Sequence, residues 1–181
     1  MENKNKYSFN KSSKKYKTFF NNEKNKIEKI LPKASIQHVG SSSVEGLCGK
    51  GIIDIAVSVP KKQIENTIKK FEKNKYSYKP SAGDKERFFL ERTIKYNGTE
   101  RRVHIQLTHK DSKSWKSMLA VRDYLRANPK DKLKYREIKK KAVIYAKQDG
   151  KKYRDYKKDF LNKIEKKALE VVHKNLTFER D

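Results

Sequence analysis

One short stretch of the sequence has the residue types and the spacing of a phosphate-binding site. Gly40 is followed by Ser41, Ser42 and Ser43, and Asp54 comes soon after them. Glycine lets the backbone approach a ligand closely, the serines offer hydroxyl groups, and a helix that begins directly after them would direct free N–H groups at anionic oxygens. The carboxylate of Asp54 can hold a divalent cation that bridges to the phosphates. The stretch therefore predicts a site for a nucleoside triphosphate with Mg²⁺ or Mn²⁺.

Asp54 is the strongest single candidate for a catalytic residue. It is the only charged residue in an otherwise apolar run at residues 52–59. Such a run is typical of a strand that is buried on both faces, where an unpartnered carboxylate would be strongly destabilising. We therefore expect Asp54 to meet a metal ion or a ligand. The alternative is a structural ion pair with Lys50 or Arg102.

Two histidines extend the candidate site. His38 lies in a run that predicts a strand at residues 36–39, and His104 lies in a later run at residues 100–108. If both strands neighbour the strand of Asp54, the three side chains would surround one cleft and could bind a transition metal such as Zn²⁺ through the imidazole nitrogens. The alternative for each histidine is a partly buried side chain that bonds to the backbone.

Four basic residues are candidates for binding the phosphates. Lys50 follows the serine turn, Arg87 precedes two phenylalanines, and Arg122 and Arg126 lie four residues apart on one predicted helical face. Two guanidinium groups at that spacing repel each other unless an anion or a carboxylate lies between them. The alternative for the arginine pair is bonding to loop carbonyls or to the acidic residues at positions 84 and 86.

The chain resembles the GrpB family of the nucleotidyltransferase superfamily over residues 14–168. Four segments carry the resemblance, and they come in the same order as in the family: IQHVGSSSVEGLCGKGIIDIAV at 36–57, RFF at 87–89, HIQ at 104–106 and WKSMLAVRDYLRANP at 115–129. The chain departs from the family's pattern in the first of these segments, where Gln37, Glu45 and Gly51 replace a Glu and two Pro.

The resemblance implies an α+β fold with a nucleotidyltransferase-like mixed sheet and the transfer of a nucleotidyl group from a nucleoside triphosphate to an acceptor. Members of the superfamily have a second carboxylate two residues after the first, and a third on a neighbouring strand. Here the second position is Ala56, and the expected strand offers His104 and Gln106. Two-metal transfer needs clustered negative charge. A non-catalytic module that binds a nucleotide, a phosphorylated small molecule or a metal is therefore the alternative.

The composition adds a third hypothesis. The formal net charge is +25, which favours attraction to nucleic acid and would suit a basic RNA-binding accessory protein. Of the 47 basic residues 38 are Lys, whereas proteins that read bases and phosphates usually rely on Arg. The lysines are also spread along the chain, which is typical of a solvated surface.

The hydrophobic pattern predicts a single domain at residues 14–175, preceded by a mobile basic arm at residues 1–13. No apolar run is long enough for a membrane span or a signal peptide, and the single Cys48 suits a reducing compartment, so we expect a cytoplasmic protein.

Helical patterns predict that the chain ends in a C-terminal helical segment. The expected strands are residues 36–39, 52–59, 76–79, 86–95 and 100–108, and the expected helices are residues 16–31, 60–71, 112–128, 130–147 and a third C-terminal one that includes 153–168.

Overall fold

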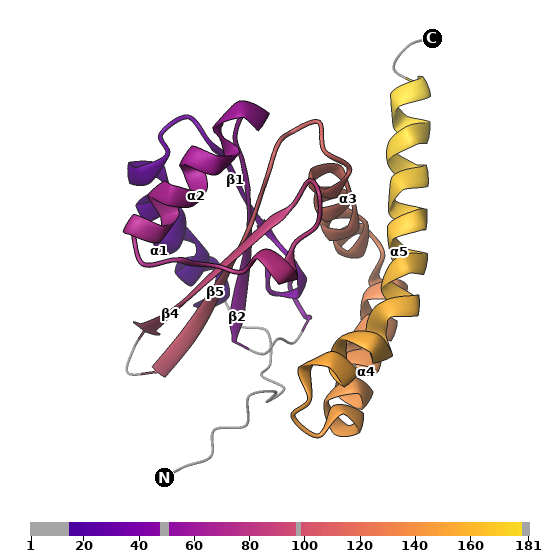
Figure 1. Cartoon of the computed structure of the whole chain (residues 1–181). Coiled ribbons are helices and arrows are strands. Elements are labelled where there is room, and N and C mark those ends of the chain that lie inside the picture. The colour runs from indigo at the N-terminus through magenta and orange to yellow at the C-terminus, as the bar shows by residue number, and fades with distance from the viewer. Residues whose placement is uncertain (1–14, 48–50, 97–98, 179–181) are drawn as a thin grey trace.

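The computed structural model describes residues 15–47, 51–96 and 99–178 (Figure 1). In this part of the chain a mixed sheet is flanked by helices, which confirms the predicted α+β fold. The strands are β1 (Ser35–Val39), β2 (Ile52–Ser58), β3 (Ser77–Tyr78), β4 (Phe88–Tyr96) and β5 (Thr99–Thr108), and the helices are α1 (Lys15–Ile30), α2 (Ile64–Lys73), α3 (Lys113–Ala127), α4 (Pro129–Ala146) and α5 (Gly150–Phe178).

The sheet has the strand order β1-β2-β5-β4-β3. Strands β2 and β5 are parallel, and the other neighbours are antiparallel. Strand β2 is thus an inner strand, as its apolar run predicts. The turn between β4 and β5, where Asn-Gly predicts a hairpin, lies outside the described residues, but the two strands pair antiparallel on either side of it.

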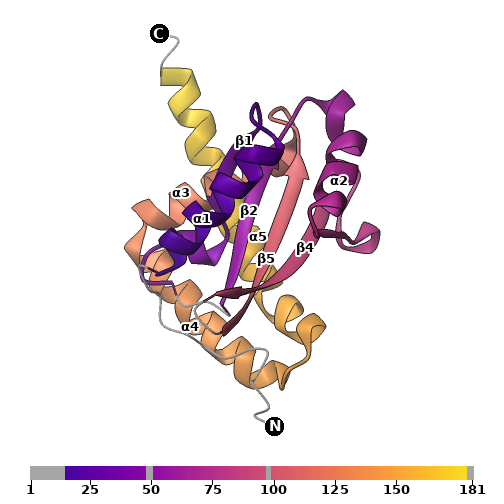
Figure 2. The same cartoon turned by 90° about the vertical axis from the view of Figure 1, so that its left-hand side faces the viewer.

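The two faces of the sheet are covered by different helices. Figures 1 and 2 show α1 and α2 on one side, and α3, α4 and α5 on the other. The main core lies under α1 and α2, and its sheet residues include Ile53, Ile55, Val103, Ile105 and Leu107. Because side chains alternate along a strand, Asp54 points to the opposite face, toward the C-terminal helices.

The C-terminal helices form a second core that reaches the sheet through the turn after β1. Val44 and Leu47 of that turn are buried with Leu125, Tyr135 and Ile164 of the helices. Figure 1 shows that the C-terminal part of α5 extends beyond the rest of the fold. Over the described ranges, none of the helices combines the length and the apolar character that a membrane span needs.

Some element boundaries differ from the predicted ones. Helix α2 begins at Ile64 rather than Pro60, because residues Lys61–Gln63 form a 3-10 turn first. Gly150 was expected to close α4, but it begins α5; the left-handed residue after α4 is Lys147, with φ of 41°. Helix α5 continues to Phe178, ten residues beyond the apolar pattern that predicts it.

Candidate functional site

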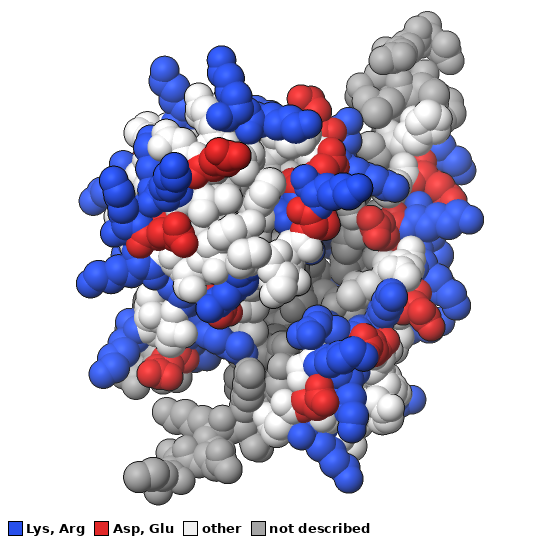
Figure 3. Space-filling view, in the orientation of Figure 1, with Lys and Arg blue, Asp and Glu red and all other residues white. Residues whose placement is uncertain are grey.

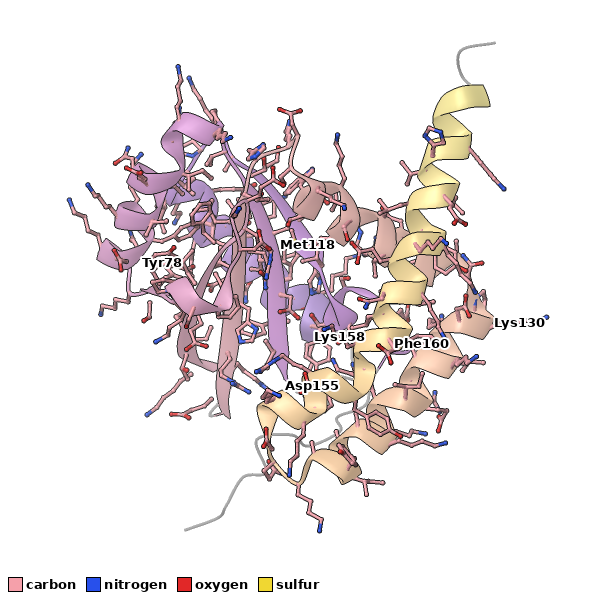
Figure 4. The ribbon with its side chains drawn as sticks, turned by 45° about the vertical axis from the view of Figure 1, so that its right-hand side comes forward. Tyr78, Met118, Lys130, Asp155, Lys158 and Phe160 are labelled. Carbon is pink, nitrogen blue, oxygen red and sulfur yellow. The ribbon has the colours of Figure 1, made fainter. Side chains whose placement is uncertain are left out.

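A cleft of about 750 Å³ opens on the face of the sheet that carries Asp54. The sheet forms one wall, and helices α3 and α5 contribute to the other. Figure 4 shows Met118 of α3 in the space between the sheet and the helices, and this residue also lines the cleft. Other lining residues are Gly40, Asp54, Arg87, Gln106, Ser117 and Glu165.

Asp54, which lines the cleft, begins a row of three polar side chains that runs across this face of the sheet. Asp54, His104 and Glu91 are register partners on β2, β5 and β4, so they point to the same face. His104 Nδ1 donates to Asp54 Oδ1 at 3.2 Å, and His104 Nε2 lies 3.9 Å from Glu91 Oε2. The side chain of Asp54 remains 28% exposed. The carboxylate is therefore partnered, but it is still accessible from the cleft.

Gly40 brings the backbone of the turn directly against Asp54. Its φ of 67° and ψ of −171° fall in a region that is essentially restricted to glycine. A Cβ atom at this position would lie 2.6 Å from Asp54 Oδ2. The structure thus places Gly40 and Asp54 in one cleft, as the sequence predicts.

The serines that follow Gly40 are not arranged as the sequence predicts. Residues 41–43 form a 3-10 turn, and Val44 is extended, so no α-helix begins there. Ser42 and Ser43 are buried; Ser42 Oγ bonds to His38 Nε2 at 3.0 Å, and Ser43 Oγ donates to the Gly40 carbonyl at 2.7 Å. Both line a second cavity of about 1160 Å³ rather than the Asp54 cleft. Ser41 is partly exposed.

His38 lies on the opposite face of the sheet from Asp54 and His104. Its register partner on β2 is Ile55, and its ring stacks on Phe20 of α1 at 4.6 Å. The predicted shared cleft for His38, Asp54 and His104 is therefore wrong, because the register of β1 directs His38 away. Within residues 15–47, 51–96 and 99–178 no three His, Cys, Asp or Glu side chains are placed to hold a metal ion together.

The environment of His38 makes the stability of the fold depend on pH. Burial lowers the pKa of His38 from 6.5 to about 4, and Arg126 and Arg122 also lower it, against the attraction of Asp54. Between these pH values the unfolded chain binds more protons than the folded one, so stability should fall as the pH drops from 6.5 to 4.

We expect His38→Gln to remove this part of the pH dependence. The difference in unfolding free energy between the wild type and the variant should change by about 2 kcal/mol across that window, a value reduced to allow for the partial exposure of the ring. Urea unfolding at several pH values measures it. A difference that stays constant from pH 7 to 4 would show that the His38 ring titrates normally in the fold.

Arg122 and Arg126 hold α3 against the end of β1 instead of facing the Asp54 cleft. Arg122 Nη1 donates to Gln37 Oε1 at 2.9 Å and to the His38 carbonyl at 3.2 Å. Arg126 Nη2 donates to the Ser43 carbonyl at 2.8 Å. Both guanidinium groups also contact Asp123. Bonding to loop carbonyls is thus the role that the structure shows for the pair.

Arg87 is the predicted basic residue that does line the Asp54 cleft. Its Nη1 donates to Gln106 Oε1 at 2.6 Å, and its Nε donates to Asp84 Oδ2 at 3.1 Å. Lys50 lies outside the described residues. Ala56, at the position of a second carboxylate, is buried against Trp115 of α3.

Lys157 of α5 is not among the site residues that the sequence predicts. Burial lowers the pKa of its ammonium group to about 8, while attraction to Asp54 raises it and Arg154 lowers it. Its Nζ lies 4.3 Å from the centre of the Tyr153 ring. The signal was its spacing, because position 157 falls on the helical face of the buried Tyr153 and Ile164. Figure 4 shows the next residue, Lys158, in the space between α5 and the sheet.

Comparison with solved structures defines the fold class. The structure resembles the MgGTP-bound Cid1 poly(U) polymerase with a TM-score of 0.55 and 14% identity, covering 76% of this chain and 44% of that one. The chain therefore has a nucleotidyltransferase-like fold.

Within that class the chain belongs to the GrpB family, whose model, described as GrpB protein, matches residues 8–167. It is similar to the crystal structure of the conserved protein GrpB from Enterococcus faecalis, with a TM-score of 0.79 and 28% identity over 91% of this chain and 99% of that one. A UPF0157 protein of Halalkalibacterium halodurans is 32% identical over 82% of this chain and 75% of its own length. The glutamate-rich protein GrpB of Alkalihalophilus pseudofirmus is 29% identical over 84% and 90%.

Proposed function

We propose that the Asp54 cleft binds a nucleoside triphosphate or another phosphorylated small molecule together with one divalent cation. The observation that carries this proposal is the exposed carboxylate of Asp54, which opens into a cleft of about 750 Å³ directly beside Gly40. The nucleotidyltransferase-like fold supports the same ligand class.

The residues present fit one cation but not two. Mg²⁺ is commonly held by one or two carboxylates, with water and substrate phosphates as its other ligands. Asp54 can supply such a carboxylate. A second metal ion would need a further carboxylate nearby, whereas position 56 is a buried alanine and the neighbouring strand presents His104. A bound Mg²⁺ or Mn²⁺ would neutralise phosphate charge; Zn²⁺ would find Asp54 and His104 as neighbouring ligands, and the described residues bring no third one to them.

The chain's own residues would orient the ligand from two sides. The bond from His104 holds Asp54 Oδ1, while Oδ2 is turned toward Gly40. Arg87 is held by Asp84 and Gln106 at one side of the cleft and offers a fixed positive charge to a phosphate. Lys157 adds a second cation whose charge Asp54 stabilises.

Nucleotidyl transfer is the second candidate function, and one observation favours it. The strand on which the resemblance places the third carboxylate offers His104 and Gln106, and His104 lies between Asp54 and Glu91. An imidazole in this position can accept the proton of an acceptor hydroxyl group.

Thermal unfolding with and without nucleotide tests the binding proposal. At about a hundredfold excess over Kd, a nucleoside triphosphate with Mg²⁺ or Mn²⁺ should raise Tm by about 5–10 °C. Asp54→Ala should abolish the shift, because the cation then has no protein ligand. Asp159→Ala is the matched control, since this exposed aspartate lies on α5 and is not among the residues that line the Asp54 cleft. An equal shift in wild type and Asp54→Ala would refute a site at Asp54.

Label transfer separates the two functions. If the cleft only binds the ligand, α-labelled triphosphate is recovered unchanged while the Tm shift persists. If it also transfers a nucleotidyl group, label appears in an acceptor from a cell extract, and His104→Gln removes the transfer but keeps most of the shift. Transfer that survives in Asp54→Ala would point to another protein in the preparation.

A further inference from the structure

A pair of exposed tyrosines marks the corner where α4 meets α5. Tyr145 is 59% exposed and Tyr156 is 41% exposed, yet their ring centres lie only 5.2 Å apart, with an angle of 41° between the rings. The same two helices also contribute Ala142, Ala146 and Tyr153 to a buried cluster. The two rings contact each other at the surface and lie outside the core.

The surface around this pair is positively charged. Between residues 141 and 159 the chain has seven Lys and Arg against three Asp and no Glu. Lys141 and Lys152 are exposed, and each lies four residues before one of the tyrosines, so it shares that tyrosine's helical face. Figure 3 shows that basic side chains predominate over the corner of α4 and α5. We call Tyr145, Tyr156, Lys141 and Lys152 the tyrosine patch.

The acidic side chains near the patch do not cancel this charge. Asp149 Oδ1 accepts hydrogen bonds from the backbone N–H groups of residues 151 and 152. Asp155 is paired with Lys151 at 3.0 Å. Two of the three aspartates are thus engaged locally, and the lysines on the faces of the tyrosines remain available to an anion.

We propose that the tyrosine patch binds single-stranded nucleic acid. The tyrosine rings offer faces on which unpaired bases can stack, and the adjacent lysines can contact the phosphates that join those bases. Aromatic rings combined with a basic surface are the usual means by which proteins bind single strands with little sequence preference. This role does not depend on the ligand of the Asp54 cleft. It is also more specific than attraction through the net charge, because it requires the tyrosine rings.

Other occupants match the patch less well. A second copy of this chain would bring two surfaces of a protein with a net charge of +25 together, which electrostatic repulsion opposes. A lipid surface needs several aliphatic side chains to insert, whereas beside the patch only Ile144, at 76% exposure, is a large exposed aliphatic residue. Paired bases in a duplex cannot stack on the rings. A single strand matches the patch better, because its unpaired bases can stack on the rings and its phosphates can contact the lysines.

Fluorescence anisotropy with a labelled oligouridylate of about 12 nucleotides tests the proposal at about 0.1 M salt. Tyr145→Ala/Tyr156→Ala should weaken binding at least tenfold, because stacking is lost. Tyr145→Phe/Tyr156→Phe should bind within about twofold of the wild type, because phenyl rings also stack. Lys141→Ala/Lys152→Ala should weaken binding and flatten its salt dependence.

The matched charge control is Lys69→Ala/Lys73→Ala on α2, which removes two exposed lysines on the other side of the sheet. Equal losses for the two lysine pairs would overturn the proposal, since net charge alone would then explain binding. Unchanged binding by Tyr145→Ala/Tyr156→Ala would also overturn it. Tighter binding to a duplex or to anionic vesicles than to the single strand would do the same. Cross-linking of a 4-thiouridine oligonucleotide to wild-type protein gives an answer that needs no variant, and it should map to residues 141–156.

Discussion

Replacing Glu23 by alanine should lower the free energy of unfolding by about 3–5 kcal/mol. The Glu23 side chain on α1 is 0% exposed and accepts a hydrogen bond from Tyr76 Oη at 2.6 Å. Arg92 Nη2 of β4 lies 2.7 Å from its Oε1 and 2.8 Å from its Oε2. Removing the carboxylate leaves the guanidinium group of Arg92 without its anion in a largely buried place, which is the main reason for the large effect.

Urea unfolding measures the effect, and Glu28→Ala is the matched control. Glu28 is on the same helix, but it is exposed and pairs only with Lys24 at 3.5 Å, so its loss should change stability by less than about 1 kcal/mol. Tyr76→Phe alone should lower stability by about 1–3 kcal/mol, and its effect should shrink in the Glu23→Ala background because the two groups are partners. If Glu23→Ala were as mild as Glu28→Ala, the network would not stabilise the fold.

This network shows why the apolar pattern of α1 predicts the helix but not its most consequential polar residue. Phe19, Glu23 and Ile27 recur every four residues, so Glu23 occupies a core-facing position. Its two hydrogen-bond partners, Tyr76 and Arg92, lie more than 50 positions away. Spacing along one helix can therefore place Glu23 inside, but only the tertiary structure supplies Tyr76 and Arg92.

The sequence likewise predicts only part of the candidate site. The apolar run around Asp54 predicts an inner strand, and the short distance in sequence from Gly40 predicts their contact; both agree with the structure. Whether His38 shares a face with Asp54 depends on the register of β1 against β2. A shift of one residue would reverse the face, and local sequence does not determine it. The pairing of Val39 with Asp54 places His38 on the other face.

Elsewhere the sequence does not determine which groups a long side chain reaches or which helical position is buried. Arg122 and Arg126 have the right spacing to act together, but their acceptors are carbonyls of β1 and of the turn after it, which α3 reaches only in the folded state. On α5, positions 156 and 157 are both compatible with the face of Tyr153, because helical periodicity is not a whole number. In the folded chain Lys157 is half-buried and Tyr156 is exposed.

Replacing Gly40 by alanine should lower the unfolding free energy by about 2–5 kcal/mol and also remove the response to nucleotide and Mg²⁺. Two effects add here. A non-glycine residue is strained at a φ of 67° and a ψ of −171°, and the new Cβ would lie 2.6 Å from Asp54 Oδ2, so the carboxylate must move. Urea unfolding measures the first consequence, and the nucleotide-dependent shift in Tm measures the second.

Gly46→Ala is the control that separates strain from contact at Gly40. Gly46 has a φ of 81°, but a Cβ there would meet only Lys132 Nζ, at 3.9 Å. It should therefore lower stability by about 1–2 kcal/mol and leave the nucleotide response intact. The effect of Gly40→Ala should be smaller in the Asp54→Ala background, since the carboxylate oxygen is then absent. The contrary result is that Gly40→Ala and Gly46→Ala lower stability equally, and by the same amounts in the Asp54→Ala background. That result would show that the turn does not press on Asp54, and that Gly40 and Asp54 do not act as one site.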